Sequence, residues 1–133
     1  MIRTIFVLLI ALTPALNSRG FSQAPKPGPV LEFEDLKQGF GMVKEGEIVE
    51  LEYKFKNTGD IPVIITETKV TCTCTSVDFP KEPILPGQTG SVKVKFDTKN
   101  KYDRQDRIIQ VISNSSGSPI IELRFKGVVL KKK

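Results

Sequence analysis

A strict alternation of apolar and charged residues from Val49 to Lys56, following Ile48, constrains this chain more than any other feature. Successive side chains of a β-strand point to opposite faces, so one face of this segment is wholly apolar and the other wholly charged. The apolar members are Val49, Leu51, Tyr53 and Phe55, and the charged members are Glu50, Glu52, Lys54 and Lys56. The pattern predicts a strand with one face on a hydrophobic core and the other in water.

The same period recurs after Val30 and predicts an all-β domain over residues 30–133. Ser91–Asp97 and Ile120–Leu130 alternate in this way, and Ile61–Thr68 is rich in β-branched residues. Arg107–Ser113 is apolar on both faces, as an inner strand should be. Turn-forming sequences separate these segments: Asn57-Thr58-Gly59-Asp60, Pro86-Gly87 and Asn114-Ser115-Ser116-Gly117-Ser118. About seven short strands are expected, in a two-sheet sandwich; a closed barrel, which usually has more even connections, is the alternative.

The N-terminus has the layout of a secretory signal peptide. Arg3 places a positive charge before the uninterrupted apolar run Ile5–Leu12, which Thr13-Pro14 ends. The run is far shorter than the roughly 20 apolar residues of a membrane-spanning helix, so no span is expected in the mature chain. Residues 1–24 are assigned to the signal peptide, with cleavage after Ser22 or Ala24, and residues 25–29 to a Pro-rich linker. The protein is therefore expected to be exported to the periplasm, the cell surface or the outside of the cell.

Composition excludes several kinds of active site. The chain has no histidine, which rules out Ser-His-Asp triads, Cys-His dyads and histidine metal sites. Two cysteines alone cannot complete a tetrahedral zinc site. The formal net charge of +5 is small and evenly mixed, which is not the pattern of nucleic-acid binding. Neither catalytic residues nor a cofactor is predicted, and the charged residues Asp103, Arg104, Asp106 and Arg107 are expected to belong to a solvated connection over Thr98–Asp106 and its border.

Cys72 and Cys74 are the only chemically distinctive pair. In a regular strand their Cα atoms would lie about 6.5–7 Å apart, whereas disulfides prefer about 4.4–6.8 Å, so a bond between them needs a bend or bulge. In oxidising surroundings two nearby thiols would tend to form that bond. Three interpretations stay open: small, half-buried structural side chains in a Thr-rich strand, thiol–disulfide exchange, and a soft-metal site for an ion such as Cu(I). Exchange needs a lowered thiol pKa, but Lys69 is expected on the opposite face from Cys72, and Met42 is the only methionine after the signal peptide.

Several motifs resemble a widespread family of secreted bacterial domains of unknown function with an immunoglobulin-like fold. The matching segments are Phe40–Glu47, Phe55–Pro62, the Cys-x-Cys-Thr motif in Thr71–Thr75, the Pro-Gly-x-x-Gly turn and strand in Ile84–Asp97, and the Val-x-Ser-Asn motif in Val111–Asn114. The resemblance covers Leu31 to about Val129 and implies an immunoglobulin-like β-sandwich. The family commonly has glycine between its cysteines; Thr73 stands here, and threonine is expected to resist tight ring geometry. The fold is more distantly similar to major sperm protein and pilus-chaperone domains, which bind other proteins, often through sheet edges.

Together these observations predict an exported, non-catalytic module that binds another envelope or secreted protein or supports an assembly. A small sandwich exposes sheet edges that can accept a strand from such a partner. The alternative function is thiol redox chemistry or Cu(I) handling through Cys72 and Cys74.

Overall fold

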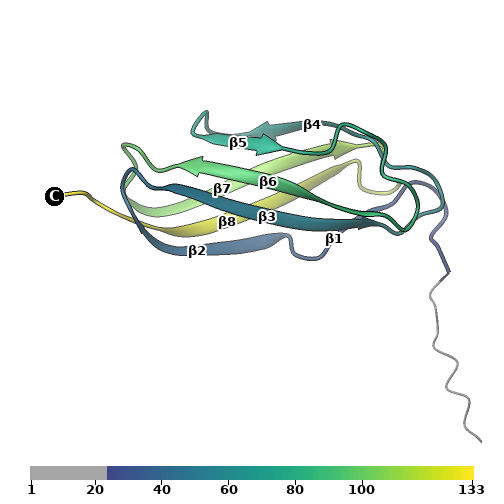
Figure 1. The fold of residues 1–133 in the computed structure, drawn as a ribbon, viewed down its shortest axis with the longest axis horizontal. Helices are drawn as coiled ribbons and strands as arrows, with labels where there is room; N and C mark the ends of the chain where they lie inside the picture. Colours follow the sequence, from purple (N-terminus) through teal and green to yellow (C-terminus); the bar gives the residue numbers. More distant parts are fainter. Residues whose placement is uncertain (1–23) are drawn as a thin grey trace, which may run out of the picture.

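The computed structural model describes residues 24–133, and its regular structure consists of eight β-strands, against an expectation of about seven. The strands are β1 (Leu31–Phe33), β2 (Lys37–Lys44), β3 (Ile48–Asn57), β4 (Ile65–Val70), β5 (Thr75–Asp78), β6 (Thr89–Asp97), β7 (Asp103–Ser113) and β8 (Ile120–Leu130). They form two four-stranded sheets, ordered β1-β3-β6-β5 and β2-β8-β7-β4, which pack face to face (Figure 1). The predicted immunoglobulin-like β-sandwich is confirmed.

The predicted signal peptide lies outside the described residues except for Ala24, and it stays a prediction. From residue 24 onward the chain contains no helix long and apolar enough to cross a membrane. The Pro-rich segment that follows is attached to the sandwich by hydrogen bonds. The backbone N–H of Lys26 donates to the carbonyl of Thr58 at 2.9 Å, and the N–H of Gly28 donates to Oδ1 of Asp60 at 2.7 Å.

The apolar face of β3 forms part of the hydrophobic core. Val49, Tyr53 and Phe55 are buried and Leu51 is half-buried, while the charged members of the pattern are exposed. Strands of both sheets and the loop before β4 contribute the rest of the core, and its largest fully buried side chains outside β3 are Phe96, Phe125, Ile109, Leu123, Val63, Val92, Val94, Val111 and Val129. Hydrophobic burial therefore fixes which face of each strand points inward.

The expected charged connection over Thr98–Asp106 is wrong in its second half, because β7 begins at Asp103. Asp103–Asp106 pair with residues of β8, and Asp106 forms ion pairs with Arg124 at 3.5 Å and Lys126 at 3.7 Å. The exposed charged residues at the start of β7 lie in a strand whose outer face meets solvent. In the sequence alone, such a run of charges resembles a loop.

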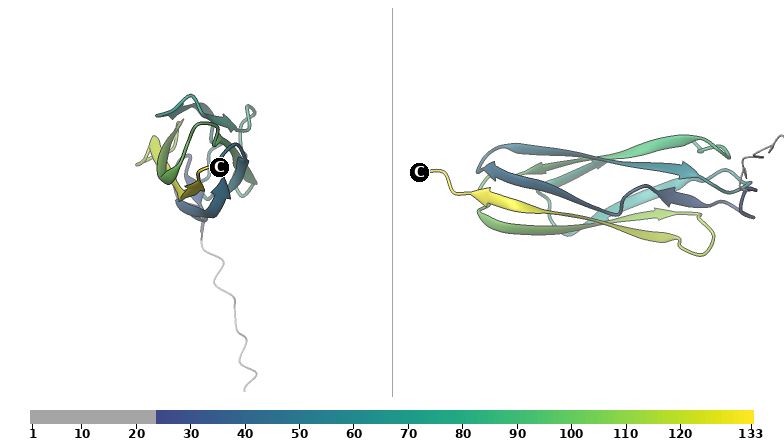
Figure 2. Two further views of the ribbon diagram at one scale, coloured as in Figure 1. Left: turned by 90° about the vertical axis from the view of Figure 1, so that its left-hand side faces the viewer. Right: turned by 90° about the horizontal axis from the view of Figure 1, so that it is seen from below.

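One continuous segment contributes to both sheets. β1 pairs antiparallel with β3, and the chain then crosses to the other sheet, where β2 pairs in parallel with β8. The β2–β8 register shifts between Gly39 and Gly41, and the ring of Phe40, which lies between them, packs against Gly127, where an added Cβ would come within 2.3 Å of the ring. The described chain starts at one end of the sandwich and its C-terminus lies at the other (Figure 2).

Two asparagines of the sequence motifs, Asn57 and Asn114, hold loops at one end of the sandwich through side-chain hydrogen bonds. Asn57 is fully buried; its Nδ2 donates to the carbonyls of Ile61 and Ile84, both at 2.9 Å, and its Oδ1 accepts from the N–H of Gly59. Asn114 acts similarly, since its Oδ1 accepts from the N–H of Ile64 at 2.8 Å.

The Pro86-Gly87 turn forms as predicted. The N–H of Gln88 donates to the carbonyl of Leu85 at 2.9 Å, and Gly87 has φ +80°, the conformation that the third position of a type II turn requires.

Candidate functional site

Cys72 and Cys74 lie in the short turn that carries the chain from β4 of one sheet to β5 of the other. A disulfide joins them, and their Cα atoms are 5.1 Å apart, within the usual range. The prediction that both cysteines lie in a Thr-rich strand is wrong, because they lie in a turn between two strands. The turn supplies the bend that a bond between two such close cysteines requires.

Backbone hydrogen bonds hold the turn. The N–H of Thr75 donates to the carbonyl of Cys72 at 3.1 Å, and the N–H of Cys74 lies 3.2 Å from Cys72 Sγ. The N–H of Asp97 donates to the carbonyl of Cys74 at 2.9 Å and so ties the turn to β6. Thr73 is not among the non-glycine residues with positive φ, which over residues 24–133 are Asn100 and Asp103. The ring therefore closes without the positive φ that would have favoured glycine over threonine at that position.

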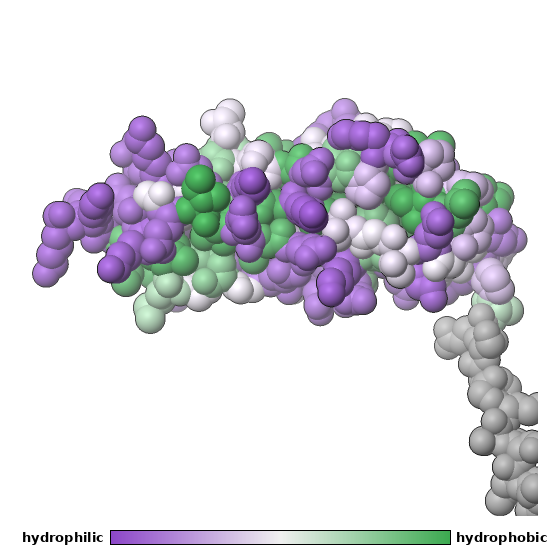
Figure 3. Space-filling view, in the orientation of Figure 1, coloured by the Kyte–Doolittle hydropathy of each residue, from purple (hydrophilic) through white to green (hydrophobic). Residues whose placement is uncertain are grey.

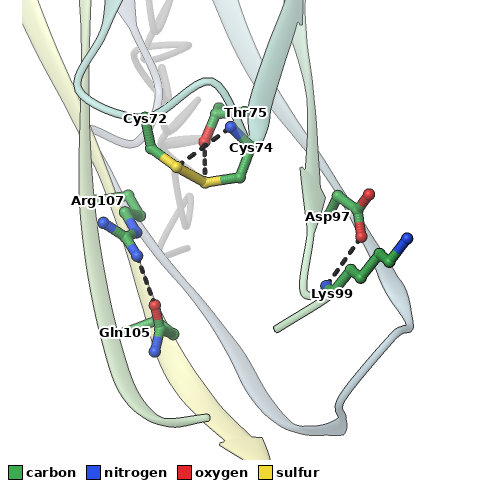
Figure 4. The surroundings of a disulfide bond; sticks show 7 residues. All are labelled: Cys72, Cys74, Thr75, Asp97, Lys99, Gln105 and Arg107. Carbon is green, nitrogen blue, oxygen red and sulfur yellow. Dashed lines mark hydrogen bonds between the residues drawn. A yellow bond between two sulfur atoms is a disulfide. The ribbon is translucent and has the colours of Figure 1, made fainter. Parts of the chain in front are cut away.

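Both cysteines are half-buried, and Cys74 packs against the hydrophobic core. Its Sγ lies 3.9 Å from Oγ1 of Thr75, a buried residue that pairs with Phe96 of β6. The disulfide therefore sits at the rim of the core, partly reachable from solvent (Figure 4).

Arg107 of β7, the strand that pairs with β4, is among the residues around this disulfide (Figure 4). It shares the inward face of β7 with Gln105, Ile109 and Val111, which are buried. Its Cζ lies 5.7 Å from the centroid of the Phe96 ring, and its Nη2 donates to Oε1 of Gln105 at 2.7 Å. Its Nε is buried and, among residues 24–133, has no hydrogen-bond partner. The expectation of a solvated Arg107 is wrong; its even spacing from Ile109 and Val111 is the sequence signal that pointed inward.

Other candidates from the sequence do not join the site. Lys69 is exposed and pairs with Glu67 at 3.5 Å, and it alternates with the inward-facing Val70. Met42 is exposed on β2, at the opposite edge of the sheet from β4. Within residues 24–133 no three side chains of His, Cys, Asp or Glu are grouped as metal ligands.

The paired carboxylates of β3 lie on its solvent face, where Glu50 forms an ion pair with Lys95 at 3.6 Å. Hydrophilic side chains cover much of the face that β3 and β6 present, with hydrophobic ones between them (Figure 3). Glu50 and Glu52 are thus part of an exposed charged surface.

A second feature lies on the outer face of the β2-β8-β7-β4 sheet. β7 is an inner strand, as predicted, but a two-sheet sandwich covers only one face of each sheet. Ile112 of β7 is directly opposite Ile120 of β8, and Ile64, just before β4, alternates with the buried Ile65. These three residues, the outer isoleucine patch, are half-buried or exposed, and Ile120 is 53% exposed. Beside the patch, β4 has a free edge, because it pairs only with β7.

Solved structures of several kinds share this fold. A protein of unknown function from Porphyromonas gingivalis W83 matches with a TM-score of 0.67 and 16% identity, over 84% of this chain and 51% of that one. The ASH / PapD-like domain 7 of human CEP192 matches with a TM-score of 0.61 and 11% identity, over 100% of both chains. The Vibrio cholerae VesB protease matches with a TM-score of 0.60 and 16% identity, over 75% of this chain and 31% of that one.

These identities establish the fold alone, as a PapD-like, immunoglobulin-like sandwich. The chain spans about half the length of the P. gingivalis protein, which it covers to 51%. No curated protein matches the sequence significantly. Residues 31–129, nearly the whole described domain, match the family described as "Protein of unknown function (DUF1573)", and the chain belongs to that family.

Proposed function

We propose that the protein is an exported, non-catalytic module of the cell envelope that binds an extended segment of another envelope or secreted protein. The observation that carries this proposal is the free edge of β4 beside the outer isoleucine patch. An unpaired strand edge presents backbone N–H and C=O groups that a partner strand can satisfy. Apolar side chains next to the edge supply the contact area that backbone pairing alone lacks.

The other sheet edges are poorer acceptors. β1 has three residues and β5 has four, so each offers a short ladder. β2 has eight residues, but its register is irregular at Phe40 and a lysine stands at each end. Bulges and edge lysines are the devices that proteins use to block strand addition. β4 has six residues; its own register irregularity lies at its start, between Ile65 and Glu67, and its pairing is regular from Glu67 to Val70, with the apolar Ile64 just before the strand and Val70 at its end.

Site-specific photocrosslinking tests the proposal. A photoreactive amino acid at Glu67, exposed on β4, should crosslink one partner in cells, and peptide mapping should place the link in one extended segment. The same group at Lys93, on the outer face of the other sheet, is the matched control and should not crosslink that segment. A synthetic peptide of the mapped segment should then bind the purified protein.

Paired variants separate the patch from general surface effects. Ile64→Lys, at the patch residue that adjoins β4, should weaken peptide binding at least tenfold, while Ile48→Lys, at another exposed isoleucine on the other sheet, should not. The Cys72→Ser/Cys74→Ser double variant should keep binding. Equal binding by wild type and Ile64→Lys, or crosslinks only at Lys93, would exclude β4 and its patch as the binding surface.

A further inference from the structure

The strongest chemical observation in the described residues is a half-buried cation, Arg107, on the inward face of β7 with no carboxylate within ion-pair distance. None of the ion pairs within residues 24–133 involves Arg107. Its guanidinium is held by a neutral amide, that of Gln105, and by the face of Phe96, while Nε has no partner. Charges withdrawn from water are normally paired, so an arrangement like this one favours the arrival of a negative charge nearby.

Strand register identifies where that charge can form. Val70 of β4 pairs with Ile109 of β7, and each step forward along β4 is one step back along β7. β4 ends at Val70, and continuing its register by two residues brings the chain level with Arg107 at Cys72, where the turn toward β5 begins. Figure 4 includes Arg107 among the residues around the disulfide, with its guanidinium turned toward Gln105.

We propose that the Cys72–Cys74 turn is a thiol–disulfide exchange site, and that Arg107 is a positioning residue that stabilises the Cys72 thiolate when the bond opens. Its reaction partner is a dithiol of another exported protein. This proposal is independent of the strand-binding function, because the two surfaces and their variants differ.

The step balances as follows. A partner thiolate attacks Cys74 Sγ, the S–S bond breaks, and its electron pair leaves on Cys72 as a thiolate beside Arg107. A thiol with a lower pKa is the better leaving group, which selects Cys72. The partner's second thiolate then attacks the partner's first sulfur, which is bonded to Cys74 in the mixed disulfide. The Cys74 sulfur leaves as a thiolate and takes up a proton. The partner dithiol is thereby oxidised to a disulfide. Its two electrons reduce the Cys72–Cys74 bond to a Cys72 thiolate and a Cys74 thiol.

The test measures alkylation of the reduced, folded protein against pH, with mass spectrometry to assign each cysteine. Cys72 is expected to titrate below the ordinary cysteine pKa of about 8.5. Arg107→Gln should raise the pKa of Cys72 and lower its alkylation rate near pH 7 about tenfold, while Arg107→Lys should keep most of the effect. Lys69→Gln is the matched control: it removes a cation close in sequence but on the opposite face, and should change nothing.

Equilibration with glutathione buffers gives a second readout. Because Arg107 stabilises the reduced form, Arg107→Gln should make the disulfide harder to reduce, and a tenfold change in the equilibrium constant equals about 30 mV. Rapid alkylation during reduction should find glutathione on Cys74. The proposal fails if wild-type Cys72 titrates at or above its ordinary value, or if Arg107→Gln leaves both readouts unchanged. The wild-type measurements decide the matter even if a variant does not fold.

Discussion

The phenolic oxygen of Tyr53 lies 2.8 Å from the backbone carbonyl oxygen of Arg124, to which the hydroxyl donates a hydrogen bond. Tyr53 is on β3 and Arg124 is on β8, so the bond passes through the core and joins the two sheets. A buried hydroxyl without such a partner would be costly, and here it fixes how the sheets sit on each other.

This bond predicts how stability depends on alkaline pH. Burial raises the pKa of Tyr53 to about 12 from its ordinary value of 10.0. Since the folded pKa is the higher one, the contribution of Tyr53 is complete below about pH 10 and is lost as the pH rises through about 12. Tyr53→Phe should cost about 1 kcal/mol at neutral pH and remove this alkaline loss. Urea unfolding of both proteins across this pH range is the measurement, and an unchanged alkaline profile in Tyr53→Phe would contradict the prediction.

Asn57→Ala should be strongly destabilising, by about 3 kcal/mol, because it removes a fully buried side chain and its hydrogen bonds to the carbonyls of Ile61 and Ile84 and from the N–H of Gly59. Asn114→Ala is the matched control, since Asn114 makes similar bonds at an exposed position and should cost about 1 kcal/mol. Equilibrium unfolding in urea compares the two. Equal losses would show that burial of Asn57 is not what matters.

Gly127→Ala should cost about 2 kcal/mol, because the new methyl group overlaps the Phe40 ring. Much of the loss should disappear when Phe40 is also changed to alanine, which a double-mutant cycle measures. Gly39→Ala should have a smaller effect, since the added methyl group would lie 3.8 Å from the backbone carbonyl oxygen of Lys126, an ordinary contact distance. An additive cycle would rule out the contact between Gly127 and Phe40.

Removal of the disulfide should leave the domain folded. The ring between Cys72 and Cys74 is so small that opening it frees little chain entropy, and Cys72→Ser/Cys74→Ser should lower stability by at most about 2 kcal/mol. Urea unfolding with and without reductant provides the check. A reduced protein that is unfolded would mean that the bond is structural, contrary to an exchange role.

The strands that cross the core could be predicted because burial imposes a readable period on them. β3, β6 and β8 alternate clearly, and their inward residues were identified correctly. β1 and β5 are too short to show a period, and β2 pairs with a strand far along the sequence while exposing Met42. Those three strands depend on tertiary pairing that local sequence does not encode.

Only part of the candidate site could be predicted from the sequence. Cys72 and Cys74 stand out by chemistry, but the threonines around them favour a strand, and only the crossing between sheets makes the segment turn. Arg107 was misplaced because a charged side chain is usually solvated. Its inward position follows from the period that it shares with Ile109 and Val111, and its nearness to Cys72 follows only from the β4–β7 register.

The parallel pairing of β2 with β8 has a mechanical consequence. Tension applied between the start of the described chain and its C-terminus pulls β2 and β8 in opposite directions along their common axis, because both strands run the same way. Their hydrogen bonds are then stressed together in shear, whereas an antiparallel hairpin pulled at its open end separates one bond at a time. Single-molecule stretching from these two ends should meet a higher force than stretching across the β7–β8 hairpin. The domain is thus arranged to transmit tension along its length without opening.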